Sequence, residues 1–570
     1  MSAEPAIAFE TVRKNFPGGI RALDDFQVTV PTGTVTGLIG PDGAGKTTAM
    51  RLIAGLLAPD HGRIQVFGHD TATEAPRIQS RLGYMPQRFG LYEDLTVQEN
   101  LDLYADLQGL ALTSRAARYE ELLHMTGLAP FGRRLAGRLS GGMKQKLGLA
   151  CVLVGKPRLL LLDEPTVGVD PVSRRELWQI VYTQVKQTGL TVLLSTAYLD
   201  EAERCQEVIL IHQGRLLGQG PPQDFSREMQ GRVYLARAEG LHQRRLQRRL
   251  AARPEILDSV IQGEWVRLVT ATPRPPRLDL HTGLELIPTD PRLEDYFVAQ
   301  LVPAAGQSEA PELSLPQRHK ADDGQPIIVV DQLKRRFGDF YAVKGISFQV
   351  RRGEIFGLLG ANGAGKTTTF RMLCGLLPVS EGEARVAGVD MRKAPAKARA
   401  RLGYMAQKFS LYGHLSVVEN MKLFSGLYGL KNKQAQERID WALSVFELSP
   451  FIGQRALDLP LGYKQRLAMA CALLHQPEML FLDEPTSGVD PLARREFWRR
   501  INALAEQGVT ILVTTHFMEE AEYCDRLVIM QAGAILASGT PEALRHHART
   551  TDNPTPSLED AFIRLIETTG

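Results

Sequence analysis

Two glycine-rich segments, GPDGAGKT at residues 40–47 and GANGAGKT at residues 360–367, fit the pattern GxxxxGK[ST]. Each follows a short apolar run and opens a segment with a helical pattern. Glycines at such a turn let backbone N–H groups face a triphosphate, while the lysine neutralises its outer phosphates and the threonine can ligate magnesium. The sequence therefore predicts two sites for a triphosphate with Mg²⁺, with binding residues Gly40, Gly43, Gly45, Lys46, Thr47 and Thr48 in one and Gly360, Gly363, Gly365, Lys366, Thr367 and Thr368 in the other.

Two carboxylates follow a continuous apolar run in each half of the chain, in LLLLDEPT (159–166) and MLFLDEPT (479–486). Such a run is typical of a strand buried on both faces of a sheet. Because ligands bind at the carboxyl ends of strands in an open parallel sheet, we expect Asp163 and Asp483 to hold magnesium, directly or through water. Glu164 and Glu484 can then orient or deprotonate the attacking water.

The two halves of the chain are copies of each other. RLGYMPQRFGLYEDLTVQENL in the first corresponds to RLGYMAQKFSLYGHLSVVENM in the second, and the spacing between matching lysines (46 and 366), glutamines (87 and 407) and aspartates (163 and 483) is constant. A solenoid would repeat every 20 to 50 residues or so. The chain is therefore expected to contain two homologous domains in tandem.

The predicted organisation has five parts, and 570 residues suffice for two or three cores. A first domain spans 1–230, and a small α+β extension spans 231–302, beginning as strand, basic helix, strand and strand. A linker rich in proline and polar residues covers 303–326, a second domain covers 327–541, and a tail covers 542–570.

Composition excludes several classes of partner and site. The net charge is +3 with both signs spread along the chain, so charge provides no argument for a nucleic-acid partner, and none is expected. The five cysteines show no CxxC spacing, which argues against zinc and for a reducing compartment. No apolar stretch approaches the roughly 20 residues that span a bilayer, so any membrane role is expected to require another chain.

These motifs resemble those of ABC ATPase nucleotide-binding domains over nearly all of 7–220 and 327–541. The resemblance implies an α/β fold with two P-loop NTPase domains, each a RecA-like mixed sheet with a helical subdomain, arranged head to tail. It also implies that an upstream aromatic stacks on adenine, that a Q-loop glutamine lies in the site and that a D-loop aspartate contributes. The matching positions are Phe16, Gln87 and Asp170 in the first half and Phe337, Gln407 and Asp490 in the second.

The halves differ at the family's signature, which senses the γ-phosphate of the nucleotide bound by the opposite domain. LSGGMKQK provides Ser140, Gly141 and Gly142, whereas LPLGYKQR has Pro460 and Leu461 at the matching positions. Proline removes a hydroxyl and a backbone donor, and leucine adds bulk where close approach is needed. Proline is nevertheless favoured in a first helical turn, so the helix is expected to persist.

The family's switch histidine, which contacts the γ-phosphate, also differs between the halves: His516 in the second corresponds to Ala197 in the first. In the head-to-tail arrangement both losses fall in site 1, built on Lys46, Asp163 and Glu164. Site 2 combines the second domain's motifs with the intact signature. We therefore expect site 2 to hydrolyse ATP through Glu484, His516 and Gln407, and site 1, with Glu164, to retain ATP and turn over slowly.

The segments PRLEDYFVAQL (291–301) and PSLEDAFIRLI (556–566) resemble the tail motif of ATPases that serve ABC-2-type exporters. This resemblance implies an ATPase that powers export, of multidrug type, through two separate membrane permeases, and that lies on the cytoplasmic face of the cell membrane. Two alternatives stay open: a tandem ABC translation factor acting on the ribosome, and a tandem sugar-importer ATPase.

Overall fold

The computed structural model describes residues 4–87, 90–276, 283–305, 315, 325–407, 410–550, 553 and 556–569. By its contacts the chain divides into two compact units. Unit 1 contains residues 1–233, 290–301 and 490–492, and unit 2 contains residues 234–289, 302–489 and 493–570. Each unit contains one of the two repeated domains.

The domain of unit 1 has two sheets. A six-stranded sheet has the order β10-β9-β3-β8-β7-β6, and a four-stranded antiparallel sheet has the order β2-β1-β4-β5. In the larger sheet β3, β6, β7, β8 and β9 are parallel, and only β10 runs antiparallel to its neighbour. The strands are β1 (Ile7–Phe16), β2 (Ile20–Val30), β3 (Val35–Ile39), β4 (His61–Val66), β5 (His69–Asp70), β6 (Leu82–Met85), β7 (Leu159–Asp163), β8 (Thr191–Thr196), β9 (Glu207–His212) and β10 (Arg215–Gly220).

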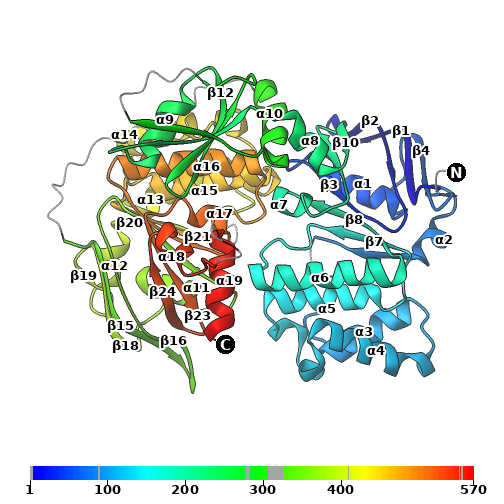
Figure 1. Ribbon diagram of the computed structural model, residues 1–570. Helices are drawn as coiled ribbons and strands as arrows, with labels where there is room; N and C mark the ends of the chain where they lie inside the picture. The colour runs from blue at the N-terminus through cyan, green and yellow to red at the C-terminus, as the bar shows by residue number, and fades with distance from the viewer. Residues whose placement is uncertain are drawn as a thin grey trace. The chain divides into compact units, whose positions relative to one another are not determined.

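Helices cover this sheet and extend away from it. Figure 1 shows α6, α5 and then the pair α3 and α4 in succession beside β7 and β8. The Thr96 side chain and Glu99 form a reciprocal capping box at the start of α3, which fixes where that helix begins. The helices are α1 (Lys46–Ile53), α2 (Ala75–Gln79), α3 (Val97–Leu107), α4 (Leu112–Thr126), α5 (Gly141–Leu153), α6 (Pro171–Thr188), α7 (Leu199–Ala202) and α8 (Pro222–Glu228).

The second domain, in unit 2, repeats this arrangement. Its sheets have the orders β20-β21-β22-β17-β23-β24 and β16-β15-β18-β19. The strands are β15 (Ile328–Phe337), β16 (Phe340–Val350), β17 (Ile355–Gly360), β18 (Glu381–Val386), β19 (Val389–Asp390), β20 (Leu402–Met405), β21 (Met479–Asp483), β22 (Thr510–Thr515), β23 (Arg526–Gln531) and β24 (Ala534–Gly539). The helices are α11 (Lys366–Leu373), α12 (Pro395–Arg399), α13 (Val417–Leu427), α14 (Asn432–Val445), α15 (Leu461–Leu473), α16 (Pro491–Glu506), α17 (Met518–Ala521), α18 (Pro541–His546) and α19 (Leu558–Thr569).

In each large sheet the apolar run that precedes the acidic pair forms the strand second from one edge, between two parallel neighbours. Every residue of β7 and of β21 is buried, as expected for strands covered on both faces. Phe481 of β21 packs edge-on against Phe370 of α11, with ring centroids 5.3 Å apart. A dense core therefore fixes the strand ends at which Asp163 and Asp483 lie.

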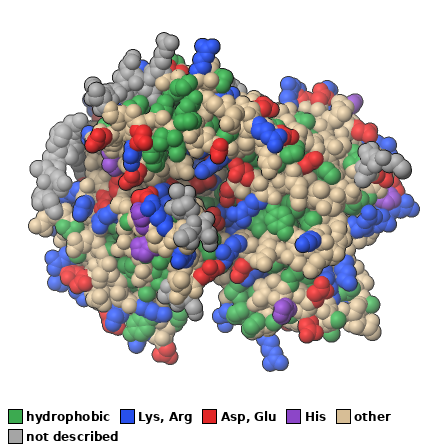
Figure 2. All heavy atoms as spheres, viewed as in Figure 1, with side chains coloured by type: hydrophobic (Ala, Val, Ile, Leu, Met, Phe, Trp, Pro, Cys, Tyr) green, Lys and Arg blue, Asp and Glu red, His purple; other side chains and the backbone are tan. Residues whose placement is uncertain are grey.

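The extension after the first domain folds as a small module. Its strands are β11 (Val233–Ala238), β12 (Ile256–Gln262), β13 (Trp265–Thr270) and β14 (Leu284–Pro288), in the sheet order β12-β13-β11-β14, and its helix is α9 (Gln243–Ala251). The next helix, α10 (Leu293–Ala305), starts within unit 1. In the described part of the chain no helix has the length and hydropathy to cross a bilayer. Basic and acidic side chains are interspersed over the face drawn in Figure 2.

Candidate functional site

The glycine-rich loop of the first domain lies between the end of β3 and the start of α1. Gly45 has φ 110°, a conformation that glycine adopts without strain, and a Cβ on Gly40 would lie 2.3 Å from the carbonyl oxygen of Ile211. The Lys46 Nζ donates hydrogen bonds to the carbonyls of Gly40 (2.8 Å) and Pro41 (3.2 Å). The loop thus wraps around a buried ammonium group that can meet phosphate oxygens.

The acidic pair of the first domain lies opposite this loop. Asp163 is the last residue of β7, and its Oδ1 accepts hydrogen bonds from Ser195 Oγ (2.5 Å) and Thr47 Oγ1 (3.3 Å). Glu164, at φ 52°, lies with its Oε1 3.5 Å from Lys46 Nζ. The predicted residues of the loop and of the strand end therefore converge.

A hydroxyl and a carboxylate in contact suit Mg²⁺, which prefers oxygen ligands and completes its octahedron with phosphate oxygens and water. Thr47 and Asp163 would hold the ion in the first domain, and Thr367 and Asp483 would hold it in the second. Bound there, the ion would neutralise charge on the phosphates. Within the described ranges no cluster of three or more His, Cys, Asp or Glu side chains could hold a metal by itself.

The second domain repeats this geometry. The Lys366 Nζ donates to the carbonyls of Gly360 (2.6 Å) and Ala361 (3.1 Å), and Gly365 has φ 99°. Asp483 ends β21, and its Oδ1 accepts a hydrogen bond from the hydroxyl of Thr514. A glycine-rich loop around a buried lysine and a carboxylate at the end of the adjacent strand are thus present in both domains.

The glutamate that follows each aspartate is held by the predicted glutamine. Gln87 Nε2 donates to Glu164 Oε2 at 2.6 Å, and Gln407 Nε2 donates to Glu484 Oε2 at 2.6 Å. In the second domain His516 Nδ1 lies 3.2 Å from Glu484 Oε2, and Lys366 Nζ lies 3.9 Å from Oε1. Glu484 therefore belongs to a buried cluster with a lysine, a glutamine and an imidazole.

The first domain lacks the imidazole, and the two glutamates differ in acidity. Ala197 is buried at the matching position and offers Glu164 no polar atom. Burial raises the pKa of Glu164 above that of an ordinary glutamate. Burial acts in the same direction on the pKa of Glu484, but His516, Lys366 and Gln407 outweigh it, and the pKa is lowered. The second domain thus favours the anion that can accept a proton from water.

The signature segments both begin helices of 13 residues, α5 and α15. Ser140 caps α5 and accepts a hydrogen bond from the N–H of Met143 at 3.3 Å. Pro460 occupies the same N-cap position of α15, at φ −54° and ψ 153°, without a side-chain bond. The helix persists, as predicted, but the proline lies at the cap and not in the first turn.

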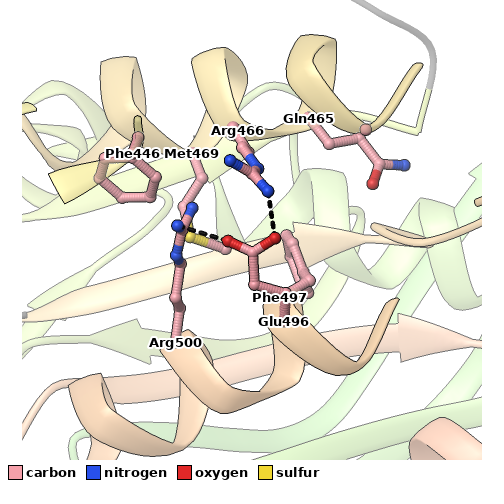
Figure 3. A pocket seen from close by; sticks show the side chains of 8 residues that line it. Phe446, Gln465, Arg466, Met469, Glu496, Phe497 and Arg500 are labelled. Atoms are coloured by element: carbon pink, nitrogen blue, oxygen red, sulfur yellow. Dashed lines mark hydrogen bonds and ion pairs between the residues drawn. The ribbon is translucent and has the colours of Figure 1, made fainter. Parts of the chain in front are cut away.

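The altered helix α15 is packed firmly against α16. Figure 3 shows Glu496 of α16 between Arg466 of α15 and Arg500 of α16, beside Phe446 and Met469. The cavity at this point admits only about 10 Å³ of solvent. Loss of the signature serine therefore leaves a helix that still serves the packing of the domain.

Other predicted residues lie near these loops or at helix starts. Phe16 ends β1, and Phe337 ends β15 with 47% of its surface exposed and with the guanidinium of Arg335 4.5 Å from its ring centre. Asp170 caps α6 by accepting from the N–H of Ser173 at 3.1 Å, and Asp490 accepts from the N–H of Leu492 at 3.0 Å. Both aspartates thus stabilise the first turn of a helix.

Two hydroxyl residues of the candidate site were not predicted from the sequence. Ser195 and Thr514 each donate a hydrogen bond to the aspartate that ends the strand, and each also accepts one from the backbone N–H of the following glutamate, at 3.1 Å in both domains. The signal was a hydroxyl residue two positions before Ala197 and before His516, in STA and TTH. Each hydroxyl thus holds the carboxylate of the aspartate and the backbone of the glutamate.

Comparisons with known proteins agree with this geometry. The family described as ABC transporter matches residues 23–167 and 343–487. The probable multidrug ABC transporter ATP-binding protein YbhF of Escherichia coli (strain K12) is 50% identical over 568 residues, which cover 99% of this chain and 98% of YbhF.

Shorter relatives match in part. The daunorubicin resistance ATP-binding protein DrrA3 of Streptomyces coeruleorubidus is 41% identical over 40% of this chain and 72% of its own length. The Nod factor export ATP-binding protein I of Paraburkholderia xenovorans (strain LB400) is 40% identical over 42% of this chain and 82% of its own length. The predicted fold class, α/β with two tandem ABC-type domains, is confirmed. With both domains matched and a relative 50% identical over 99% of this chain, the chain belongs to the ABC transporter family, as a tandem ATP-binding subunit with ATPase activity coupled to transport.

Proposed function

We propose that this chain powers an exporter of multidrug type through two separate ABC-2-type membrane permeases and lies on the inner face of the cell membrane. Support comes from relatives whose names refer to multidrug transport, daunorubicin resistance and Nod factor export. The predicted tails add to this support because both halves carry the same LED-x-F pattern at the start of a terminal helix.

The tail helices pack into the cores of their own units. Leu293 and Phe297 of α10 are buried, as are Leu558 and Phe562 of α19. Asp295 accepts a hydrogen bond from the N–H of Arg292 at 2.7 Å and so caps its helix. The motif is therefore a structural signature, and the surface that meets a permease is expected elsewhere.

The segments after the Q-loop glutamines are the proposed permease contacts. Tyr92 is 60% exposed and Tyr412 is 56% exposed, whereas Leu411 is buried. Phe89 and Phe409, which the sequence places in the same segments, lie outside the described residues. Large exposed aromatics at matching positions of both domains suit two permeases that each insert a short helix.

We also propose that the two sites are unequal, with site 2 hydrolysing Mg-ATP and site 1 retaining it. One observation carries this proposal: His516 lies beside Glu484, whereas buried Ala197 leaves Glu164 without such a partner. The intact signature, with Ser140, is proposed to complete site 2, and the segment with Pro460 is proposed to complete site 1. Site 1 still has Lys46, Gln87 and Asp163, so it keeps the groups that bind nucleotide and metal.

Purification from detergent-solubilised membranes tests the transport proposal. We expect two hydrophobic subunits to co-purify with the tagged chain and to stimulate its ATPase activity. The Tyr92→Ala and Tyr412→Ala double variant should lose these subunits while retaining ATP binding. Co-purification with ribosomes would instead support the tandem translation factor, and a complex with a solute-binding protein for sugars would support the importer; either result would overturn the exporter proposal.

A further inference from the structure

The module of residues 234–289 packs with the second domain, although it follows the first domain in the chain. Figure 1 shows α9 and the strand β12 beside α16. The surfaces that meet are polar and largely buried. This arrangement implies that the module has a role other than nucleotide binding.

Helix α9 contributes three contacts along one face. Arg244 forms an ion pair with Asp525, which precedes β23, and Gln247 accepts a hydrogen bond from Asn502 Nδ2 at 3.0 Å. Arg248 donates to Glu506 Oε2 at 2.7 Å. Arg244, Gln247 and Asn502 are buried, whereas Arg248 lies at the exposed edge of the contact. Removing one partner would leave a buried polar group without its match.

The sheet of the module adds two further contacts. Asp258 of β12 is buried and pairs with Arg495 of α16, with 2.7 Å between Oδ2 and the guanidinium nitrogen. Gly263, in the turn between β12 and β13, approaches α18 so closely that a Cβ would lie 2.6 Å from the guanidinium nitrogens of Arg545. Its φ of 63° also favours glycine. The module therefore contacts α16, α18 and the start of β23 at once.

Both ends of the module join elements that belong to unit 1. Val233 of unit 1 precedes the module directly, and Asp290 of unit 1 follows it directly. On that side Phe225 of α8 packs against Tyr296 of α10, with ring centroids 5.1 Å apart. The backbone N–H of Leu293 also donates to Glu203 Oε1 at 3.0 Å. The chain is thus fixed in unit 1 before and after the module.

We propose that the module is an intramolecular anchor that binds the second ABC domain on α16 and stays bound throughout the nucleotide cycle. The anchor holds the two halves together at a point separate from the linker and from the nucleotide sites. Helix α16 also bears Glu496, which pairs with Arg466 of the altered signature helix α15. The anchor is therefore connected, through one helix, to the segment that begins at Pro460.

Cross-linking in the full chain tests this anchor. Arg248, which is exposed, and Glu506, which is partly exposed, are replaced by cysteines, and a protease site is introduced into the linker within 316–324. The five natural cysteines are all buried, so they remain as they are. After treatment with a short bis-maleimide and cleavage, the two fragments should stay joined on a denaturing gel, with equal yield without nucleotide and with Mg-ATP. As a matched control, the cysteine at position 248 is moved to Glu239, an exposed residue of the same module, and this cysteine should not cross-link to the cysteine at position 506.

Charge reversal provides the second measurement. Cleaved but uncross-linked fragments should co-elute in size exclusion without nucleotide, whereas Arg495→Asp should weaken their association at least tenfold. Adding Asp258→Arg to Arg495→Asp should restore most of the association, and Glu239→Arg should have no effect. Fragments that separate without nucleotide in the unmodified sequence, or a cross-link that forms only with Mg-ATP, would overturn the proposal. Failure of the permeases to co-purify would leave this result unaffected, because no membrane subunit is needed.

Discussion

Glu484→Gln is expected to abolish most of the ATPase activity of the assembled complex. The carboxylate lies within 2.6 Å of Gln407 Nε2 and 3.2 Å of His516 Nδ1, and the glutamine that replaces it keeps an oxygen for the first contact. The variant should therefore fold and bind Mg-ATP, but its amide cannot accept the proton of the attacking water. A positioned general base contributes about 10²- to 10⁴-fold, which corresponds to roughly 3–5 kcal/mol of barrier.

The matched control is Glu164→Gln. The Glu164 carboxylate also accepts a hydrogen bond from a Q-loop glutamine, Gln87, at 2.6 Å. The substitution therefore removes the same chemical group from similar surroundings. The one difference is that buried Ala197 stands where the second domain has the imidazole. Phosphate release at saturating Mg-ATP should stay above about half of the unmodified rate, because site 1 contributes little turnover. The reasoning is refuted if Glu164→Gln loses as much activity as Glu484→Gln, or more.

Three further predictions concern the signature, the core and a buried acid. Ser140→Ala should lower ATPase activity about 100-fold, as expected for loss of one donor to the phosphate, whereas Pro460→Ala should leave it within about twofold; equal losses would contradict the assignment of signatures to sites. In urea unfolding, Phe481→Ala should lower the free energy of unfolding by about 3–5 kcal/mol, while exposed Phe340→Ala should change it by under about 0.5 kcal/mol. Burial raises the pKa of Glu520 to about 7, so the stability linked to its proton is lost as pH rises from the ordinary glutamate range through about 7; Glu520→Gln should thus stabilise the protein more at pH 8 than at pH 5, and a pH-independent effect would contradict this.

The site's main groups could be predicted from the sequence because their geometry is local. Lys46 follows a loop whose glycines fix the backbone, and Asp163 follows a strand whose burial is evident from an unbroken apolar run. The difference between Ala197 and His516 was also readable, because the segments VLLSTA and ILVTTH match each other even though the offset between the halves shifts by one residue before them. Most residues of the candidate site could thus be predicted from local sequence patterns.

The remaining features depend on contacts between distant segments. Nothing in the string DSVIQGEW indicates that Asp258 meets Arg495, because the partner lies more than 200 residues away in the other half of the chain. The extension was expected to follow the first domain as a separate piece, and its contacts group it with the second. Ser195 and Thr514 were missed for a similar reason, since a hydroxyl residue in a strand reveals its role only when the neighbouring strand is known.

Nucleotide content after a single round of binding tests the inequality of the two sites most directly. The complex would be incubated with labelled Mg-ATP, separated rapidly from free nucleotide and quenched, and the retained ATP and ADP would be counted per chain. With a clamp at site 1, about one unhydrolysed ATP should remain per chain, and it should disappear in Lys46→Ala but persist in Lys366→Ala. Retention of ADP alone, or loss of the retained ATP only in Lys366→Ala, would contradict the account.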